Sequence, residues 1–294
     1  MYLIHIIKRF YVPQEGFFFS VSCGTMRLGG TVAFFRAVAL AFSMFSRLPV
    51  PRVAWSERHL RYMLCAFPLV GAAVGAAVGA AVALTLARAD GLLAALCVVV
   101  LPVAVTGGIH LDGFMDTCDA LACHAGRSER LAVMEDSRAG AFAVLGCALY
   151  LLAQYVLALV LCRTMAGASG RERLAPWVCV CASFVLSRLL SALAVAVFPA
   201  AKERGLLRTF ADAAARRFTA VWCVAWFAAA VAAMVWCGGR YGVAAAGAQV
   251  VTFAGYFGMT KRQFGGITGD TAGWFVQVSE LLSLAAVAVT AVWS

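Results

Sequence analysis

Charged residues are scarce in this 294-residue chain, since Asp, Glu, Lys and Arg make up 13% of it and hydrophobic residues make up 63%. This composition excludes an ordinary water-soluble globular protein. Acidic residues are the scarcest, with 14 Asp and Glu against 24 Lys and Arg. A net charge of +10 would suggest nucleic acid binding in a soluble protein, but the basic residues here lie between apolar segments. We therefore expect no nucleic acid partner.

Cysteine and histidine motifs for metal binding are also absent. The 11 cysteines form no C-x-x-C pair, and most lie in or beside apolar segments, as is typical of small buried residues. The sequence also contains no H-E-x-x-H motif, the pattern that would indicate a zinc site. The N-terminus has no apolar run of the signal-peptide type, so we treat residues 1–30 as an N-terminal extension whose start need not be native.

Long apolar segments dominate the rest of the chain. Several reach the roughly 20 residues that a helix needs to cross a bilayer. We predict an all-α, polytopic transmembrane helical bundle, with residues 31–294 as a single membrane-embedded domain and a short interfacial or re-entrant helix at 31–46. About seven spanning helices are expected, near residues 62–89, 91–109, 138–162, 175–199, 219–237, 241–259 and 275–293.

The distribution of basic residues predicts the orientation of this bundle. Seven spans place loops 47–61, 110–137, 200–218 and 260–274 on one side, where they carry 14 Lys or Arg when Arg138 is included, against 5 on the other side. Short basic loops remain in the cytoplasm. We therefore expect a multi-pass protein of the cytoplasmic (inner) membrane, with the lipid bilayer as partner and these four loops facing the cytoplasm.

The most informative segment is T-G-G-I-H-L-D-G-F-M-D-T-C-D at residues 106–119, in which Asp112, Asp116 and Asp119 share one face of a helix. Three carboxylates on one face repel one another unless a cation lies between them. Mg²⁺ is commonly held by one or two carboxylates together with substrate phosphates. The pattern predicts a Mg²⁺ site for phosphate chemistry, with a solvated acidic loop as the alternative. His110, just before these aspartates, is a candidate catalytic residue or metal ligand.

Two more segments on the same side carry acids. Glu135 and Asp136 are candidates for a general base or for completing the metal site, and the alternative is that Asp136 or Ser137 caps the next helix. Asp270 lies in the glycine-rich segment 265–273, whose backbone amides are suited to phosphate oxygens. The candidate substrate-binding residues are Arg47, Arg138, Arg188, Lys261, Thr268 and Thr271.

Arg188 falls near the middle of a predicted span. An unpaired cation at this depth costs several kcal/mol, so we expect a partner acid or a phosphate, or else a purely structural ion pair with another helix.

Taken in order along the chain, these segments resemble the cobalamin synthases, or adenosylcobinamide-GDP ribazoletransferases. The resemblance spans roughly residues 31–290. Besides the aspartate segment it includes F-S-R-L-P-V-P (45–51), F-P-L-V-G (67–71), E-D-S-R-A-G (135–140), S-R (187–188), F-P (198–199) and G-I-T-G-D-T (266–271). One departure is Ala120, where the family usually has glycine.

The resemblance implies a membrane transferase. In this reaction a hydroxyl of α-ribazole, or of its 5′-phosphate, attacks the phosphate of adenosylcobinamide-GDP beside the cobinamide arm, and GMP leaves. The product is adenosylcobalamin or its 5′-phosphate, and the family resemblance implies Mg²⁺ as cofactor. The sequence leaves homo-oligomerisation open.

Three other functions fit the sequence less well. A CDP-alcohol phosphotransferase would carry D-x-x-D-G-x-x-A-R, but here Gly113 follows the first aspartate and no Ala-Arg follows at the required offset. A secondary transporter would place its charges near the bilayer midplane, often within inverted repeats, which the sequence lacks. A purely structural membrane subunit gives no reason for acids and glycines to gather in loops on one side.

Overall fold

The computed structural model describes residues 29–294 except 52, 54–59, 89 and 204–205. This part of the chain forms helices and no strand, apart from one isolated bridge between Ala200 and Ile267. The predicted all-α fold is confirmed, whereas residues 1–28 of the predicted N-terminal extension lie outside the described residues. The helices are α2 (Gly29–Phe45), α4 (Met63–Leu86), α5 (Gly91–Thr106), α6 (Ile109–Ala122), α7 (Arg127–Val133), α8 (Ala141–Thr164), α9 (Gly170–Val197), α10 (Leu206–Ala213), α11 (Arg216–Gly238), α12 (Arg240–Gln263) and α13 (Gly269–Val292).

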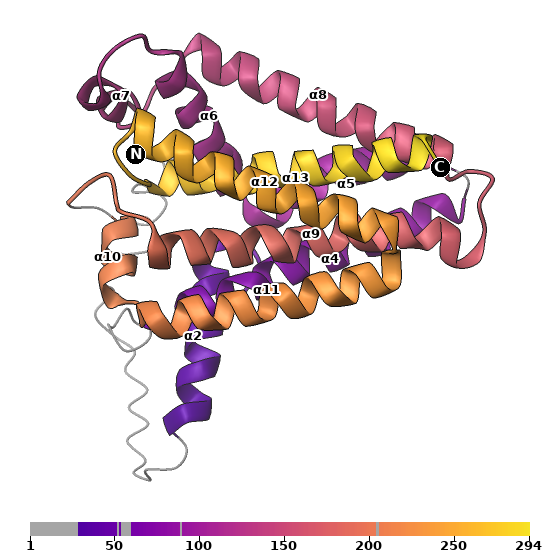
Figure 1. Ribbon diagram of the computed structural model, residues 1–294, viewed down its shortest axis with the longest axis horizontal. Coiled ribbons are helices and arrows are strands. Elements are labelled where there is room, and N and C mark those ends of the chain that lie inside the picture. The colour runs from indigo at the N-terminus through magenta and orange to yellow at the C-terminus, as the bar shows by residue number, and fades with distance from the viewer. Residues whose placement is uncertain (1–28, 52, 54–59, 89, 204–205) are drawn as a thin grey trace.

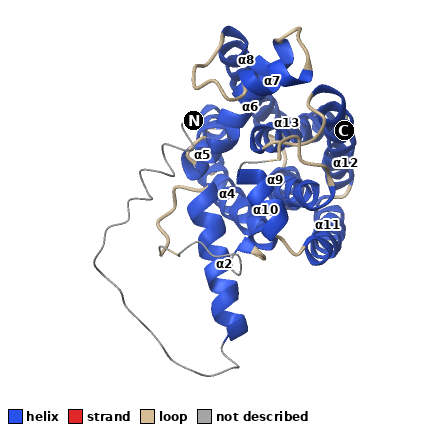
Figure 2. Ribbon diagram, turned by 90° about the vertical axis from the view of Figure 1, so that its left-hand side faces the viewer, coloured by secondary structure: helices blue, strands red, loops and turns tan. Residues whose placement is uncertain are grey.

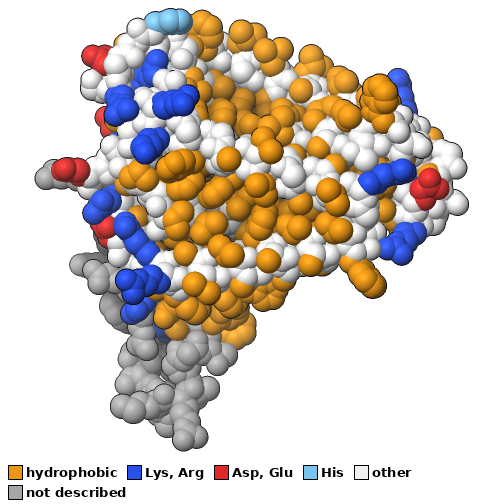
Figure 3. All heavy atoms as spheres, viewed as in Figure 1, with side chains coloured by type: hydrophobic (Ala, Val, Ile, Leu, Met, Phe, Trp, Pro, Cys, Tyr) orange, Lys and Arg blue, Asp and Glu red, His pale blue; other side chains and the backbone are white. Residues whose placement is uncertain are grey.

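Helices α4, α8, α9, α11, α12 and α13 are long and apolar enough to cross a membrane. A helix of 24 residues, such as α4, is roughly 36 Å long, which exceeds a hydrocarbon core of about 30 Å. Most of the long helices run along the bundle in Figure 1. On the face shown in Figure 3, hydrophobic side chains form a band between two ends that carry the charges. The bundle is therefore that of a polytopic membrane protein.

The chain bends sharply where the sequence predicted the end of a span at residue 109. Helix α5 ends at Thr106, and α6 starts at Ile109 after a bend of 97°. The bend occurs at Gly107 and Gly108, whose φ angles of +68° and +79° are accessible to glycine with little strain. If α5 and α6 count as one broken span, the described residues contain up to seven spans. Much of the predicted loop 110–137 is therefore helical, as α6 and α7.

Helix α9 is the centre of the bundle, where it packs against α4, α11, α12 and α13. Its close packing against α4 depends on small residues. A Cβ atom on Gly75 would lie 2.5 Å from the carbonyl oxygen of Cys181, so the two backbones could not approach this closely with a larger residue.

Helix α2 is short and extends away from the bundle, as both Figure 1 and Figure 2 show. Leu40 and Ala41 are buried in the core that includes α4, whereas Phe34 and Phe35 are 54% and 65% exposed. With 17 residues, α2 is shorter than a typical span. These features agree with the predicted short interfacial or re-entrant helix.

Candidate active site

Helices α6 and α13 bring together acids that are far apart in the sequence. A Cβ atom on Gly113 would lie 2.8 Å from both the Cα atom and the carbonyl oxygen of Asp270. The two helices therefore touch at this glycine, between Asp112 and Asp116 in the sequence. As a result, the first turn of α13 lies against the aspartate-bearing part of α6.

The three carboxylates of Asp112, Asp116 and Asp270 form an acidic cluster. The negative charges of Asp112 and Asp270 both act on Asp116, with a smaller contribution from Asp119. Among the described residues, no Lys or Arg forms an ion pair with any of the three carboxylates in the cluster. Like charges that act on one another are destabilising, so a bound cation would stabilise the cluster.

Asp112 and Asp116 are the residues of the acidic cluster that would hold a Mg²⁺ ion together with a phosphate ligand. Within the described part of the chain, no three His, Cys, Asp or Glu side chains converge as a complete metal site. Mg²⁺ does not require one, because it is usually bound through one or two carboxylates together with water and substrate phosphates. Asp112 and Asp116, one helical turn apart on α6, provide that donor set.

Asp119 has a different role from the other two aspartates of α6. Its carboxylate accepts hydrogen bonds from the backbone amides of Gly140 at 2.6 Å and Ala143 at 2.7 Å. It therefore caps the N-terminus of α8 from another helix. The alternative interpretation that Asp136 or Ser137 caps this helix is wrong, because α8 begins later than predicted and its own N-cap, Gly140, has no side chain.

Ala120, the position that departs from the glycine usual in the resembled family, is fully buried next to this cap. It packs with Met134 and Phe264 in a small hydrophobic cluster. The methyl group is therefore accommodated in an apolar space and does not enter the acidic cluster.

Glu135 and Asp136 lie in the exposed segment between α7 and α8, and each pairs with a cation. Arg138 Nη2 lies 2.7 Å from Asp136 Oδ2, and hydrogen bonds from Arg138 lower the pKa of Asp136 to about 2. Lys202 Nζ lies 2.8 Å from Glu135 Oε1 and lowers the pKa of Glu135. A general base works best when its pKa is near the working pH, so neither carboxylate is well suited to that role.

Lys202 was not predicted from the sequence. Besides its bond to Glu135, its positive charge acts on Asp270, so it lies between two of the predicted acids. Its loop is held in place by backbone hydrogen bonds from Ile267 to Pro199 and from Ala201 to Ile267, both 2.9 Å. The only sequence signal was a lysine three residues after the Phe198-Pro199 pair.

Thr268 and Thr271 form the cap of α13. The Thr268 hydroxyl accepts from the Thr271 amide at 3.1 Å, and the Thr271 hydroxyl accepts from the Thr268 amide at 2.9 Å. Both residues are buried. This capping box fixes the start of α13 and therefore positions Asp270, which follows Thr268 by two residues.

Arg47 and Lys261 lie at different places on the same end of the bundle. The Arg47 backbone amide donates to the Val105 carbonyl at 2.8 Å, and its side-chain stem covers Gly107. Arg47 therefore lies beside the α5–α6 bend. Lys261 is exposed in the last turn of α12, with its ammonium 5.6 Å from the centre of the Phe257 ring.

His110 is buried inside the bundle. Its imidazole lies near the aromatic rings of Phe45 and Phe67, with centroid distances of 6.2 and 5.8 Å. Neither ring nitrogen has a hydrogen-bond partner among the described residues, although the side chain is only 5% exposed. Buried polar atoms are normally paired, so this imidazole is suited to a partner that enters the site.

Arg188 is paired with an acid inside the bundle, whereas the sequence analysis left open an acid or a phosphate as its partner. Its guanidinium forms a buried ion pair with Glu280 of α13, and the Ser187 hydroxyl donates to the same carboxylate at 2.8 Å. Arg188 and Glu280 are 1% and 4% exposed. Arg188 therefore joins α9 to α13 and is not a free cation at the surface.

Comparisons with known proteins identify the family of the chain. The model of the cobalamin-5-phosphate synthase family matches residues 37–288. A protein of Lachnoclostridium phytofermentans named adenosylcobinamide-GDP ribazoletransferase is 34% identical over 85% of this chain and 92% of its own length. Proteins of the same name from Escherichia coli and Shigella dysenteriae are 37% and 36% identical, over 83% of this chain and 96% of their own length. No solved structure matches the chain. The chain belongs to the cobalamin-5-phosphate synthase family.

Proposed function

We propose that this protein is a Mg²⁺-dependent adenosylcobinamide-GDP ribazoletransferase. It joins adenosylcobinamide-GDP with α-ribazole, or α-ribazole 5′-phosphate, to give adenosylcobalamin or its 5′-phosphate and GMP. The observation that carries the proposal is the acidic cluster of Asp112, Asp116 and Asp270, built by the contact between α6 and α13 at one end of a membrane bundle. Family membership and the names of the relatives support the choice of substrates.

Asp112 and Asp116 would hold Mg²⁺ together with oxygens of the substrate pyrophosphate. When bound, the ion neutralises the negative charge that develops on the departing GMP. The protein then has two further tasks, which are to orient the attacking hydroxyl and to bind the phosphates.

We assign the orientation and deprotonation of the hydroxyl to Asp270. The capping box of α13 fixes its backbone, and its carboxylate acts electrostatically on Asp116. Lys202 lies near enough for its charge to act on Asp270. Glu135 and Asp136 are poorer choices because their cation partners lower the pKa of both.

The phosphate-binding groups are drawn from the same end of the bundle. Arg47, beside the α5–α6 bend, and Arg138 are exposed cations that can bind phosphate oxygens. Lys261 is a third exposed cation at this end. His110 is buried, and its ring nitrogens have no hydrogen-bond partner among the described residues, so it would bind a phosphate oxygen or the attacking hydroxyl only if the packing around it opened.

The site faces the cytoplasm in this proposal, and the protein lies in the inner membrane. The loops at the end of the bundle that holds the acidic cluster contain most of the Lys and Arg. The positive-inside rule assigns such loops to the cytoplasmic face. A cytoplasmic site also gives direct access to water-soluble nucleotide substrates.

The test is conversion of adenosylcobinamide-GDP and α-ribazole by the purified protein in detergent, with GMP and the corrinoid product followed separately. Equal amounts of both products are expected, because one bond is exchanged for another. Folded protein that forms neither product contradicts the proposal. Uptake of either substrate into proteoliposomes without chemical conversion would instead identify a transporter.

A further inference from the structure

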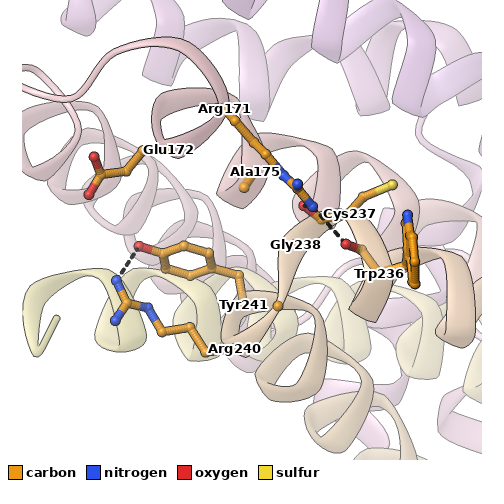
Figure 4. A pocket seen from close by; sticks show the side chains of 9 residues that line it. Arg171, Glu172, Ala175, Trp236, Cys237, Gly238, Arg240 and Tyr241 are labelled. Carbon is orange, nitrogen blue, oxygen red and sulfur yellow. Dashed lines mark hydrogen bonds between the residues drawn. The ribbon is translucent and has the colours of Figure 1, made fainter.

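A groove of about 400 Å³ lies at the opposite end of the bundle from the acidic cluster. It is formed where α9 and α12 begin and α11 ends, and Figure 4 shows the side chains that line it. Its polar and aromatic residues are Arg171, Glu172, Trp236, Arg240 and Tyr241. None of these residues was a candidate for the active site.

The two arginines of the groove retain unused hydrogen-bond donors. Arg171 Nη2 donates to the carbonyls of Trp236 at 2.8 Å and Cys237 at 3.4 Å, and Arg240 Nη2 lies 3.4 Å from the Tyr241 hydroxyl (Figure 4). A guanidinium has five N–H donors, so both can bind another acceptor. Neither arginine forms an ion pair with a carboxylate in the described part of the chain. The groove therefore has capacity for a phosphate.

The position of the groove indicates where that phosphate would come from. Trp236 lines the groove and is 83% exposed, and Trp293, just after α13, is 87% exposed. The Tyr241 hydroxyl lies 3.4 Å from that of Ser294, which places the end of α13 beside the groove. Exposed tryptophans are typical of the level at which lipid headgroups meet the hydrocarbon core. The groove consequently opens at headgroup level, on the membrane face away from the acidic cluster.

Glu172 narrows the choice of headgroup. It is an exposed carboxylate in the lining, so the groove carries two positive charges and one negative charge. Figure 4 shows the Arg240 guanidinium and the Glu172 carboxylate on the side of the Tyr241 hydroxyl, whereas the Arg171 guanidinium points toward Trp236 and Cys237. A phosphate would therefore lie at Arg240, and a primary ammonium on the same headgroup would lie at Glu172. A headgroup with a phosphate but no ammonium leaves the Glu172 charge unpaired.

We propose that this groove binds the headgroup of an aminophospholipid such as phosphatidylethanolamine, with the phosphate on Arg240 and the ammonium on Glu172. The lipid belongs to the leaflet opposite the active site. This assignment does not depend on the proposed enzymatic activity.

The test is lipid retention by the purified full-length protein, measured by native mass spectrometry from detergent that contains equal amounts of phosphatidylethanolamine, phosphatidylglycerol and phosphatidylcholine. Retention of phosphatidylethanolamine should exceed that of the other two. Arg240→Gln should lower it about tenfold, the effect of losing one charge-assisted hydrogen bond. Arg163→Gln is the matched control, because Arg163 is an exposed arginine at the end of α8 that does not line the groove.

Two further variants separate charge from folding. Arg240→Lys keeps the charge and should retain more lipid than Arg240→Gln, which a folding defect common to both variants would not produce. Glu172→Gln should remove the preference for phosphatidylethanolamine over phosphatidylglycerol while leaving retention of the phosphate-bearing lipids. Thermal unfolding of each variant in the same detergent controls for loss of structure.

Three results would overturn the assignment. The first is equal retention by Arg240→Gln and Arg163→Gln. The second is a preference of the unaltered protein for phosphatidylglycerol, which excludes an ammonium on Glu172. The third is displacement of the lipid by millimolar inorganic phosphate, which would identify a site for free phosphate in place of a lipid.

Discussion

At the scale of single residues, the three aspartates of α6 differ in what surrounds them, although their spacing in the sequence is regular. Asp112 and Asp116 remain without a cation partner among the described residues, whereas Asp119 accepts two backbone hydrogen bonds from the start of α8. The sequence predicted their common helical face. It did not predict the cap, because Gly140, the N-cap residue of the helix that Asp119 caps, lies 21 residues further along the chain.

We expect Asp119→Ala to destabilise the protein by roughly 0.5–2 kcal/mol, the usual effect of losing an N-cap. Thermal unfolding in detergent measures the change. Asp112→Asn serves as the comparison, since Asp112 is exposed and caps no helix, and it should not lower the unfolding temperature. Equal destabilisation by both substitutions would contradict the capping role.

The pH dependence of Asp136 follows from its pairing with Arg138. Hydrogen bonds from Arg138 lower the pKa of Asp136 to about 2 in the folded state, so the carboxylate is ionised at neutral pH. Any stabilisation from this pair is present above the unfolded pKa of about 3.9 and is lost as the pH falls through about 2. Asp136→Asn should therefore leave the shape of the turnover profile between about pH 5 and 8 unchanged. If the low-pH side of the turnover profile shifts in this variant, the general base is Asp136.

At the scale of the elements, the α5–α6 bend is the feature that places the aspartates. The Gly107-Gly108 pair was visible in the sequence, but an apolar run continuing to residue 109 predicted an unbroken span. Hydropathy records only the length of an apolar segment and not its direction. The left-handed backbone of the two glycines turns the chain by 97°, so α6 does not continue the direction of α5.

Gly107 and Gly108 offer a matched pair of substitutions. Alanine at either position strains a left-handed backbone by roughly 1–2 kcal/mol. At Gly107 the new methyl group would also lie 2.5 Å from Arg47 Cγ, whereas at Gly108 the nearest atom is 3.9 Å away. If Arg47 binds substrate phosphate, Gly107→Ala should raise KM more than Gly108→Ala does. Equal KM values for both variants would remove Arg47 from the binding site.

At the scale of the whole molecule, the fold class was largely predictable because six of the predicted spans reappear as single long helices. The packing between them was not predictable. Nothing in the spacing of Gly113 indicates contact with Asp270. The role of Lys202 depends on backbone pairing between two distant loops, which its position in the sequence does not reveal. Hydropathy therefore yields the helices, whereas contacts between distant segments determine the site.

The Arg188–Glu280 pair tests how far that packing depends on buried charge. Arg188→Met leaves Glu280 as an uncompensated carboxylate between α9 and α13, and we expect a loss of about 3–5 kcal/mol in unfolding free energy. The double variant Arg188→Met, Glu280→Leu should recover much of that loss, because no unpaired charge remains. Denaturant unfolding in detergent measures both variants. A double variant as unstable as the single one would show that the charges themselves are required.

The most direct test of the central claim is the Mg²⁺ dependence of GMP release from adenosylcobinamide-GDP and α-ribazole. The unaltered protein should release GMP with Mg²⁺ and not with EDTA. Asp112→Asn should reduce turnover by about a hundredfold or raise the Mg²⁺ requirement, because it removes one of two carboxylates that hold the ion. Turnover that persists in EDTA, or an Asp112→Asn protein as active as the unaltered one, would contradict a metal site on α6.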